Sequence, residues 1–152
     1  MRIHSSRTIS GVVLATILCA ASTFASNHHS LNGTWTLIPT KSDFAGQTVI
    51  QTGTVTINDR ERNITVSRNF TYDGASETVF SSFSTDGRVN STIHEGKDFK
   101  SKAKWENNIL KVTTTQGGAT TVERYSLAAD GTLILNVELP DHKPINLVFQ
   151  HQ

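Results

Sequence analysis

The sequence predicts an all-β protein whose main part is a single antiparallel up-and-down β-barrel of about eight to ten strands. Turn-forming dipeptides such as Asp73-Gly74 and Asp130-Gly131 recur at intervals of 9 to 13 residues, and they supply the positive φ angles that tight hairpins need. The segments between them are strand-length and rich in Val, Ile, Thr, Phe and Tyr. After Ala25, no segment keeps a helical apolar period over three turns, so long helices are not expected.

Strand-like segments follow one another along the whole of the expected domain. Consecutive strands joined by short turns pair as neighbours, which predicts a meander. An open sheet of this size would leave two unpaired edges and an uncovered apolar face, and closing the sheet into a barrel removes both problems. A two-sheet β-sandwich is the alternative. The expected strands are Gly33–Leu37, Val49–Ile57, Asn63–Tyr72, Glu77–Ser84, Val89–His94, Asp98–Glu106, Ile109–Thr115, Thr121–Leu127, Thr132–Leu139 and Ile145–Gln150.

Alternation of apolar and polar residues indicates which side chains face the interior. In the segment Asp98–Glu106, Phe99 and Trp105 share one face, and the lysines at positions 100, 102 and 104 share the other. In the segment Ile64–Tyr72 the apolar residues also alternate, and Arg68 lies in phase with them. Arg68 is therefore predicted to point into the barrel.

The N-terminal residues have the features of a signal peptide. Arg2 and Arg7 precede an apolar run, Gly11–Ala21, and the small residue Ala25 stands where cleavage is expected. The apolar run has 11 residues, whereas about 20 are needed to cross a bilayer; a retained anchor is the alternative. The expected division of the chain is a signal peptide at 1–25, a polar linker at 26–30 and a β-barrel domain at 31–152.

Cleavage and export affect both charge and covalent structure. The leader carries two of the 14 basic residues and none of the 13 acidic ones. The mature chain is therefore close to neutral, which gives no electrostatic reason to bind nucleic acid or an anionic membrane. Cys19, the only cysteine, leaves with the leader, so stability must come from an apolar core. We expect a periplasmic or secreted protein that does not insert into the membrane after cleavage.

The opening of the expected barrel carries the most specific motif of the chain. Residues 33–35, Gly-Thr-Trp, resemble the Gly-x-Trp opening of lipocalins, and with Leu37, Ser42 and Phe44 they also resemble the first strand of fatty-acid-binding proteins. Over most of the mature chain, the pattern is similar to a group of exported bacterial lipocalin-like proteins with no single assigned activity. The resemblance implies a calycin-like barrel, and it supports the fold more than the function.

We assign structural roles to Gly33, Trp35 and Trp105. Gly33 permits close backbone approach where the chain enters the barrel, and Trp35 closes one end as a large apolar stopper. The chain departs from both families: residues 144–152 hold no arginine that could stack on Trp35, and the adjacent Arg124 and Tyr125 point to opposite faces instead of forming an Arg-x-Tyr carboxylate clamp. Strand-like sequence begins soon after residue 44, so lid helices are not expected.

A ligand site in the barrel would combine apolar walls with a few polar groups. Arg68 could pair there with an anionic head group. The alternatives are an internal ion pair with Glu123, which shares the phase of Tyr125, or a bulge that turns Arg68 outward. The predicted lining residues are Arg68, Phe70, Tyr72, Phe83, Phe99, Tyr125 and Leu135.

Metal and catalytic signatures are weak in this sequence. No histidine pair has the spacing of a zinc site, and we expect no metal and no cofactor. Cleavage after residue 25 would place His28 third in Ser26-Asn27-His28, an arrangement that can bind Cu(II) or Ni(II); a plain polar tail is the alternative. No nucleophile elbow or Ser-His-Asp arrangement is found, so an enzyme is not expected.

The leading functional hypothesis is an exported carrier of a small, mainly apolar molecule, anionic if Arg68 is its anchor. The alternative is a protein-binding module, such as an inhibitor or an envelope accessory factor, whose barrel is filled with side chains. The interior distinguishes the two, because a cavity of roughly several hundred Å³ favours the carrier.

Overall fold

The computed structural model describes residues 28–60, 62–94 and 96–152. Within them the chain forms ten strands and one short 3₁₀ helix, which confirms the predicted all-β fold. Strand ends differ from the predicted ones by at most three residues. The strands are β1 (Gly33–Leu37), β2 (Thr52–Arg60), β3 (Asn63–Tyr72), β4 (Ala75–Ser84), β5 (Asp86–His94), β6 (Lys97–Glu106), β7 (Ile109–Gln116), β8 (Ala119–Leu127), β9 (Leu133–Glu138) and β10 (Ile145–His151).

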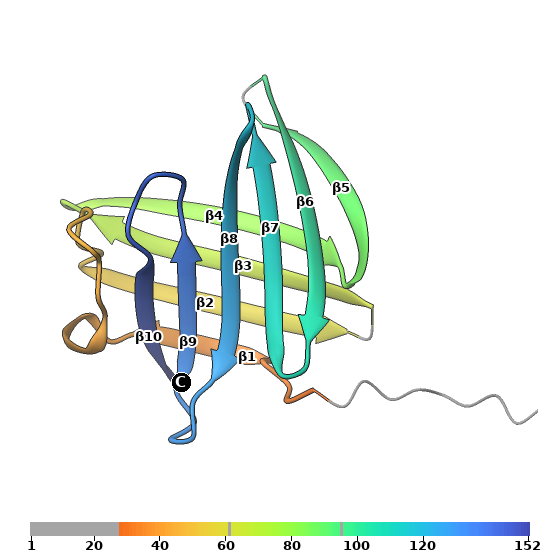
Figure 1. Ribbon diagram of the computed structural model, residues 1–152. Coiled ribbons are helices and arrows are strands. Elements are labelled where there is room, and N and C mark those ends of the chain that lie inside the picture. Colours follow the sequence, from red (N-terminus) through yellow and green to blue (C-terminus); the bar gives the residue numbers. More distant parts are fainter. Residues whose placement is uncertain (1–27, 61, 95) are drawn as a thin grey trace, which may run out of the picture.

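All ten strands belong to one antiparallel sheet in the order β4-β3-β2-β1-β10-β9-β8-β7-β6-β5. Every strand except β1, β10 and the two at the ends lies between its sequence neighbours, and β1 pairs with β10, with Trp35 opposite His151 and Leu37 opposite Phe149. In Figure 1, β2, β3 and β4 run across the direction of β6, β7 and β8, so the sheet curls over on itself. This single sheet is the predicted up-and-down barrel and not a sandwich.

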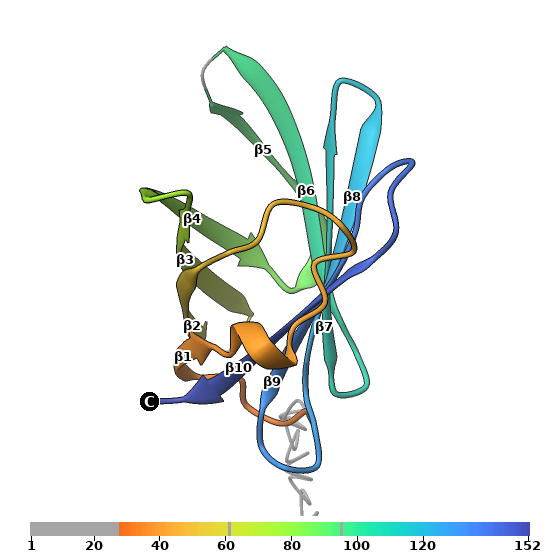
Figure 2. The ribbon, with the colours of Figure 1, turned by 90° about the vertical axis from the view of Figure 1, so that its left-hand side faces the viewer.

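The barrel is nearly closed, and its edges are β4 and β5. These strands lie at the two ends of the hydrogen-bonded order, and Figure 2 shows the β5–β6 hairpin leaning away from β4. Our expectation that closure removes both sheet edges is therefore wrong at this position. The physical reason is geometric: twist and stagger accumulate along the order from β4 to β5, and the two end strands diverge instead of exchanging ladder bonds.

The core fills the end of the barrel where β1 begins. Leu31, Ile57, Ile64, Leu110 and Leu133 are fully buried there, because every second residue of each strand points inward. The indole of Trp35 is 4% exposed and its Nε1–H donates to the carbonyl oxygen of Leu31 at 3.0 Å. Its polar atom is satisfied, so the residue can serve as the predicted apolar stopper of this end.

The connection between β1 and β2 crosses the opposite end. A 3₁₀ helix at Pro39–Lys41 is followed by a loop that we call the mouth loop, residues 42–51. Strand β2 begins at Thr52, so the predicted start at Val49 is wrong. Val49 is 52% exposed while Ile50 is buried, an arrangement typical of a loop folded over a cavity. The described connection contains no lid helices, as expected, and no helix in the described residues is long and apolar enough to cross a membrane.

Part of the expected polar linker packs against the barrel. The imidazole of His28 stacks on the indole of Trp105, with ring centroids 3.6 Å apart, and its Nε2 lies 2.6 Å from Oδ2 of Asp59. The side chains of His28 and Asp59 are 10% and 7% exposed. Trp105 thus joins this segment to the barrel wall through the ring contact. Residues 1–27, including the expected signal peptide, lie outside the described residues.

Candidate ligand-binding site

A cavity of about 290 Å³ lies beneath the mouth loop. Its walls come from the loop itself, from β3, and from β8, β9 and β10, so strands from the two halves of the sheet face each other across it (Figure 2). Most of the wall is aliphatic or aromatic, and one acidic and one basic side chain reach it. The lining residues are Phe44, Gln47, Thr48, Ile50, Arg68, Phe70, Tyr72, Glu123, Leu135, Val137, Ile145 and Leu147.

Four of the seven predicted lining residues line this cavity: Arg68, Phe70, Tyr72 and Leu135. The other three lie elsewhere. Phe83 and Tyr125 belong to the core, 7% and 1% exposed, and the partly buried Phe99 lies on β6, opposite Gln116 of β7. The alternation found the interior face correctly but could not show how deep along the barrel each inward residue lies.

Arg68 points inward and forms an ion pair across the barrel. Its Nη1 lies 2.5 Å from Oε1 of Glu123, and the hydroxyl of Tyr125 donates to Oε2 of the same carboxylate at 2.9 Å. The side chains of Arg68 and Glu123 are 20% and 14% exposed. The ion-pair alternative considered from the sequence is thus confirmed, and both carboxylate oxygens of Glu123 are engaged by the protein itself.

The electrostatics of this group follow from burial and proximity. Burial, followed by the charge of Glu123, raises the pKa of Tyr125 well above its ordinary value. Tyr125 and Glu123 together hold the pKa of Arg68 above its ordinary value, against the effect of burial. Tyr72 at the cavity wall also has a raised pKa, first through burial and then through Glu77. The guanidinium is charged and both phenols are neutral at neutral pH.

The mouth loop supplies lining residues that the sequence reasoning missed. Its base is tied to β10 by two backbone hydrogen bonds between Asp43 and Asn146, at 2.7 and 2.8 Å. Its middle is held by the contact of Gln47 Nε2 with His142 Nδ1 on the β9–β10 turn, at 3.1 Å. The signal for Ile145 and Leu147 was present in the alternation of the last strand. For the loop residues there was no signal, because Thr48-Val49-Ile50 has strand composition.

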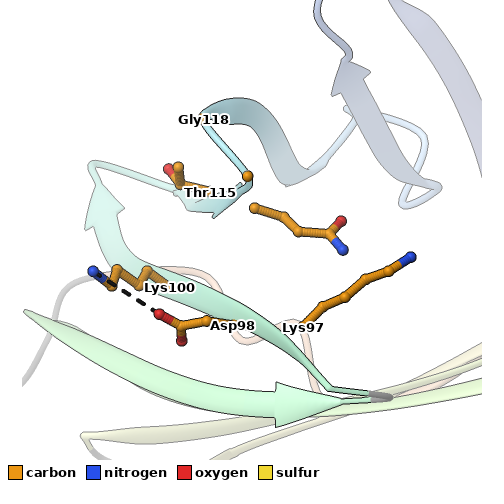
Figure 3. A pocket seen from close by; sticks show the side chains of 7 residues that line it. Lys97, Asp98, Lys100, Thr115 and Gly118 are labelled. Carbon is orange, nitrogen blue, oxygen red and sulfur yellow. Dashed lines mark ion pairs between the residues drawn. The ribbon is translucent and has the colours of Figure 1, made fainter.

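A second hollow, of about 600 Å³, lies outside the barrel wall at the tips of β6 to β8. Lys97, Asp98 and Lys100 line one side, and the turn at Gly117-Gly118 lines the other (Figure 3). Lys100 and Asp98 approach to 4.0 Å, and both are more than half exposed. With exposed charged walls, this hollow lacks the apolar enclosure of a small-molecule site.

No site for a metal ion is formed by the described residues: no group of three or more His, Cys, Asp or Glu side chains converges there. The copper or nickel hypothesis involves Ser26 and Asn27, which lie outside the described residues, and His28, whose Nε2 is hydrogen-bonded to Asp59.

No protein-family model matches the sequence, and no curated protein matches it. Solved structures do. Human cRBP IV superposes with a TM-score of 0.62 at 19% identity, over 82% of this chain and 99% of that chain. A fatty-acid-binding protein of Schistosoma mansoni in complex with arachidonic acid gives 0.61 at 18%, over 83% and 98%. The secretory abundant heat soluble protein 4 of Ramazzottius varieornatus gives 0.61 at 14%, over 80% and 94%.

The fold is a calycin-like barrel. At these identities the likeness establishes the fold alone. This calycin-like barrel departs from the lipocalin and fatty-acid-binding-protein patterns at the positions where the sequence already departed from them. His151 of β10 packs edge-on against Trp35 where a lipocalin usually has an arginine, and Arg124 faces outward, paired with Glu138 at 2.7 Å, while Tyr125 is buried.

Proposed function

We propose that this calycin-like barrel is an exported carrier, periplasmic or secreted, that holds one small, mainly apolar molecule beneath its mouth loop. The observation that carries the proposal is the cavity of about 290 Å³ with an apolar wall. Its volume is at the lower end of the range of small-molecule sites, roughly 300–1,000 Å³. A ligand of moderate size fits such a space, and the packed core beneath it sets the floor.

The structural neighbours support a carrier, because the Schistosoma mansoni protein is named as a fatty-acid-binding protein and was solved with arachidonic acid. We propose binding and not catalysis. The buried titratable groups near the cavity, Arg68, Glu123 and Tyr125, are paired with each other. A pair that satisfies itself has no open position next to a reacting atom, as an acid or base in catalysis requires.

Export rests on the signal-peptide features of residues 1–25. Mass measurement of the protein from its native compartment tests it. We expect a chain that starts at Ser26, or within a residue or two of it. An intact Met1 or a lipidated Cys19 would contradict export of the kind proposed.

A displacement assay with a neutral fluorescent probe tests the carrier function. Wild-type protein should bind the probe saturably at micromolar concentration, and V137F, which fills the cavity from β9, should lose most of that binding. V122F is the matched control. Val122 lies opposite Glu138, and Glu123 lies opposite the inward-facing Val137, so Val122 is on the outer face of the barrel and the same change there leaves the cavity unfilled. A wild-type protein without saturable binding, or equal binding by V137F and V122F, would refute the carrier function.

The edge strands favour a second candidate, a protein-binding module. Phe80 of β4 is 67% exposed, and Val89 and Ile93 of β5 are 62% and 77% exposed. Apolar residues on edge strands are typical of sites where another strand adds to a sheet. Size-exclusion chromatography of the wild type and of F80S/I93S distinguishes the two cases. A self-associating or partner-bound wild type that becomes monomeric in the double variant favours the module.

A further inference from the structure

The two charged residues that line the cavity are paired with each other. Among the described residues that line it, Arg68 and Glu123 alone carry a charge. Nη1 of Arg68 lies 2.5 Å from Oε1 of Glu123, and Oε2 of Glu123 accepts a hydrogen bond from the hydroxyl of Tyr125. The cavity therefore has a polar centre with no net charge, and its carboxylate has no free oxygen toward the ligand.

Further negative charge lies close to this centre. Glu77 of β4 is paired in register with Phe70, and residues opposite each other in a sheet point to the same face. Glu77 also contributes to the raised pKa of Tyr72. A ligand that approaches Arg68 thus meets Glu123 directly at the guanidinium, while Glu77 is an exposed residue on the same face of the sheet and does not line the cavity.

An ionised acid is a poor ligand for such a centre. Its carboxylate would either lie next to Glu123, where like charges repel, or displace Glu123 from Arg68 and leave a partly buried carboxylate without its partner. A neutral hydroxyl or carbonyl group needs neither change. A guanidinium has five N–H donors, and the bond to Glu123 uses Nη1, so donors remain for a neutral acceptor.

The rim offers further partners to a neutral group. Thr48 and Tyr72, which carry hydroxyls, and Gln47, whose Nε2 contacts His142, line the same cavity. Hydroxyl groups and amides both donate and accept, so they match an alcohol, an ester or an amide, and none of them supplies the positive charge that would compensate a carboxylate.

We propose that the cavity selects a neutral ligand, an apolar chain with one hydroxyl or carbonyl group, over the ionised acid with the same chain. This inference rests on the proposed carrier function and names the ligand class of that site. Arg68 acts as a hydrogen-bond donor to the ligand. Because Glu123 neutralises the positive charge of Arg68, the pair disfavours anionic ligands.

Matched ligands test the selection. Decanol and decanoic acid compete against a neutral fluorescent probe at pH 8, where the acid is ionised. Wild-type protein should bind decanol at least about tenfold more tightly than decanoate, a free-energy difference the size of one hydrogen bond. The ratio of the two affinities, decanol over decanoate, is the quantity to compare between variants. Because any apolar cavity disfavours an ionised acid, the decisive quantity is the change of this ratio in E123Q. That variant frees the charge of Arg68, and the ratio should fall by about tenfold or more.

The matched control is E138Q. Glu138 pairs with Arg124 at 2.7 Å on the outer face of β8 and β9, so E138Q makes the same chemical change outside the barrel and should leave the ratio unchanged. If thermal melting shows that E123Q does not fold, R68M/E123L replaces it. In that variant both charges are replaced by apolar groups, decanol loses the Arg68 donor, and its affinity should fall about three- to tenfold.

The outcomes test the selection of neutral ligands and the carrier function separately. Tighter binding of decanoate by wild type, or an unchanged ratio in a folded E123Q, would overturn the selection of neutral ligands while the carrier function stands. Undiminished binding of decanol by R68M/E123L would show that Arg68 donates no hydrogen bond to a neutral ligand, and it would overturn the selection as well. Failure of wild type to bind either ligand or the probe would refute the carrier function itself and with it this inference.

Discussion

The imidazole of His151 packs edge-on against the indole of Trp35, with ring centroids 4.7 Å apart and an interplanar angle of 86°. The two residues are opposite each other in the pairing of β1 with β10. The contact therefore joins the first strand to the last at the closed end of the barrel. Edge-to-face pairs of this kind contribute about 0.5–1.5 kcal/mol beyond the area that they bury.

Replacement of Trp35 by alanine should destabilise the protein strongly. The indole is 4% exposed, and removal of a large buried aromatic side chain lowers the free energy of unfolding by about 3–5 kcal/mol. Urea unfolding of W35A, compared with that of H151A, measures the effect. H151A removes the ring contact and an exposed hydrogen bond to the carbonyl oxygen of Gln152, and should lose about 1 kcal/mol. A W35A protein as stable as wild type would show that the closed end does not depend on this side chain.

Gly33 should not tolerate a side chain. Its φ is +134°, and a Cβ there would lie 2.3 Å from Nε2 of His151. G33A should therefore lose about 1–3 kcal/mol from backbone strain, and more from displacement of the His151 ring. G131A is the control: Gly131 also has a positive φ, +80°, but no atom lies within 4 Å of its added Cβ. Equal losses in the two variants would mean that the close approach to His151 has no energetic consequence.

Replacement of Arg68 alone should cost more stability than replacement of the whole ion pair. R68M leaves Glu123, 14% exposed, without its cationic partner, and loss of one partner of a buried pair costs about 3 kcal/mol or more. R68M/E123L removes both charges and should recover most of that loss. Denaturant unfolding of both variants and of E123L completes a double-mutant cycle. A coupling free energy near zero would show that the pair adds nothing to stability.

The protein should lose stability at alkaline pH through Tyr125. The folded-state pKa of this phenol is raised above the ordinary 10.0, first by burial and then by Glu123. A raised pKa stabilises the folded state fully below pH 10, and this contribution is lost as the pH rises toward the folded value, by up to about 1.4 kcal/mol per pH unit. Unfolding of wild type should therefore become easier above pH 10. Y125F should have a flatter profile, and parallel profiles for the two proteins would contradict the assignment.

The sequence predicted most of the fold because local patterns decide it. The strand Asn63–Tyr72 was predicted to the residue, and its alternation placed Arg68 on the inner face together with Val66 and Phe70. The inward phase of Glu123 also followed from its neighbours, which is why the ion pair could be named as an alternative. Period-two patterns and turn dipeptides carry this information without any long-range contact.

The parts that were missed depend on contacts distant in the chain. Whether β4 pairs with β5 depends on the accumulated twist of the whole sheet, which no single segment records. The depth of Tyr125 and Phe83 in the core depends on the stagger between strands. The mouth loop has strand composition at Thr48-Val49-Ile50, and its attachments, Asp43 to Asn146 on β10 and Gln47 to His142, hold it over the cavity.

The pairing of β1 with β10 has a consequence for biosynthesis. The strand that opens the barrel has its partner at residues 145–151, so the sheet cannot close around Trp35 until residues 145–151 have left the ribosome. Contacts of such high sequence separation form late and slowly. A nascent chain therefore cannot complete this fold until β10 has been synthesised and can pair with β1.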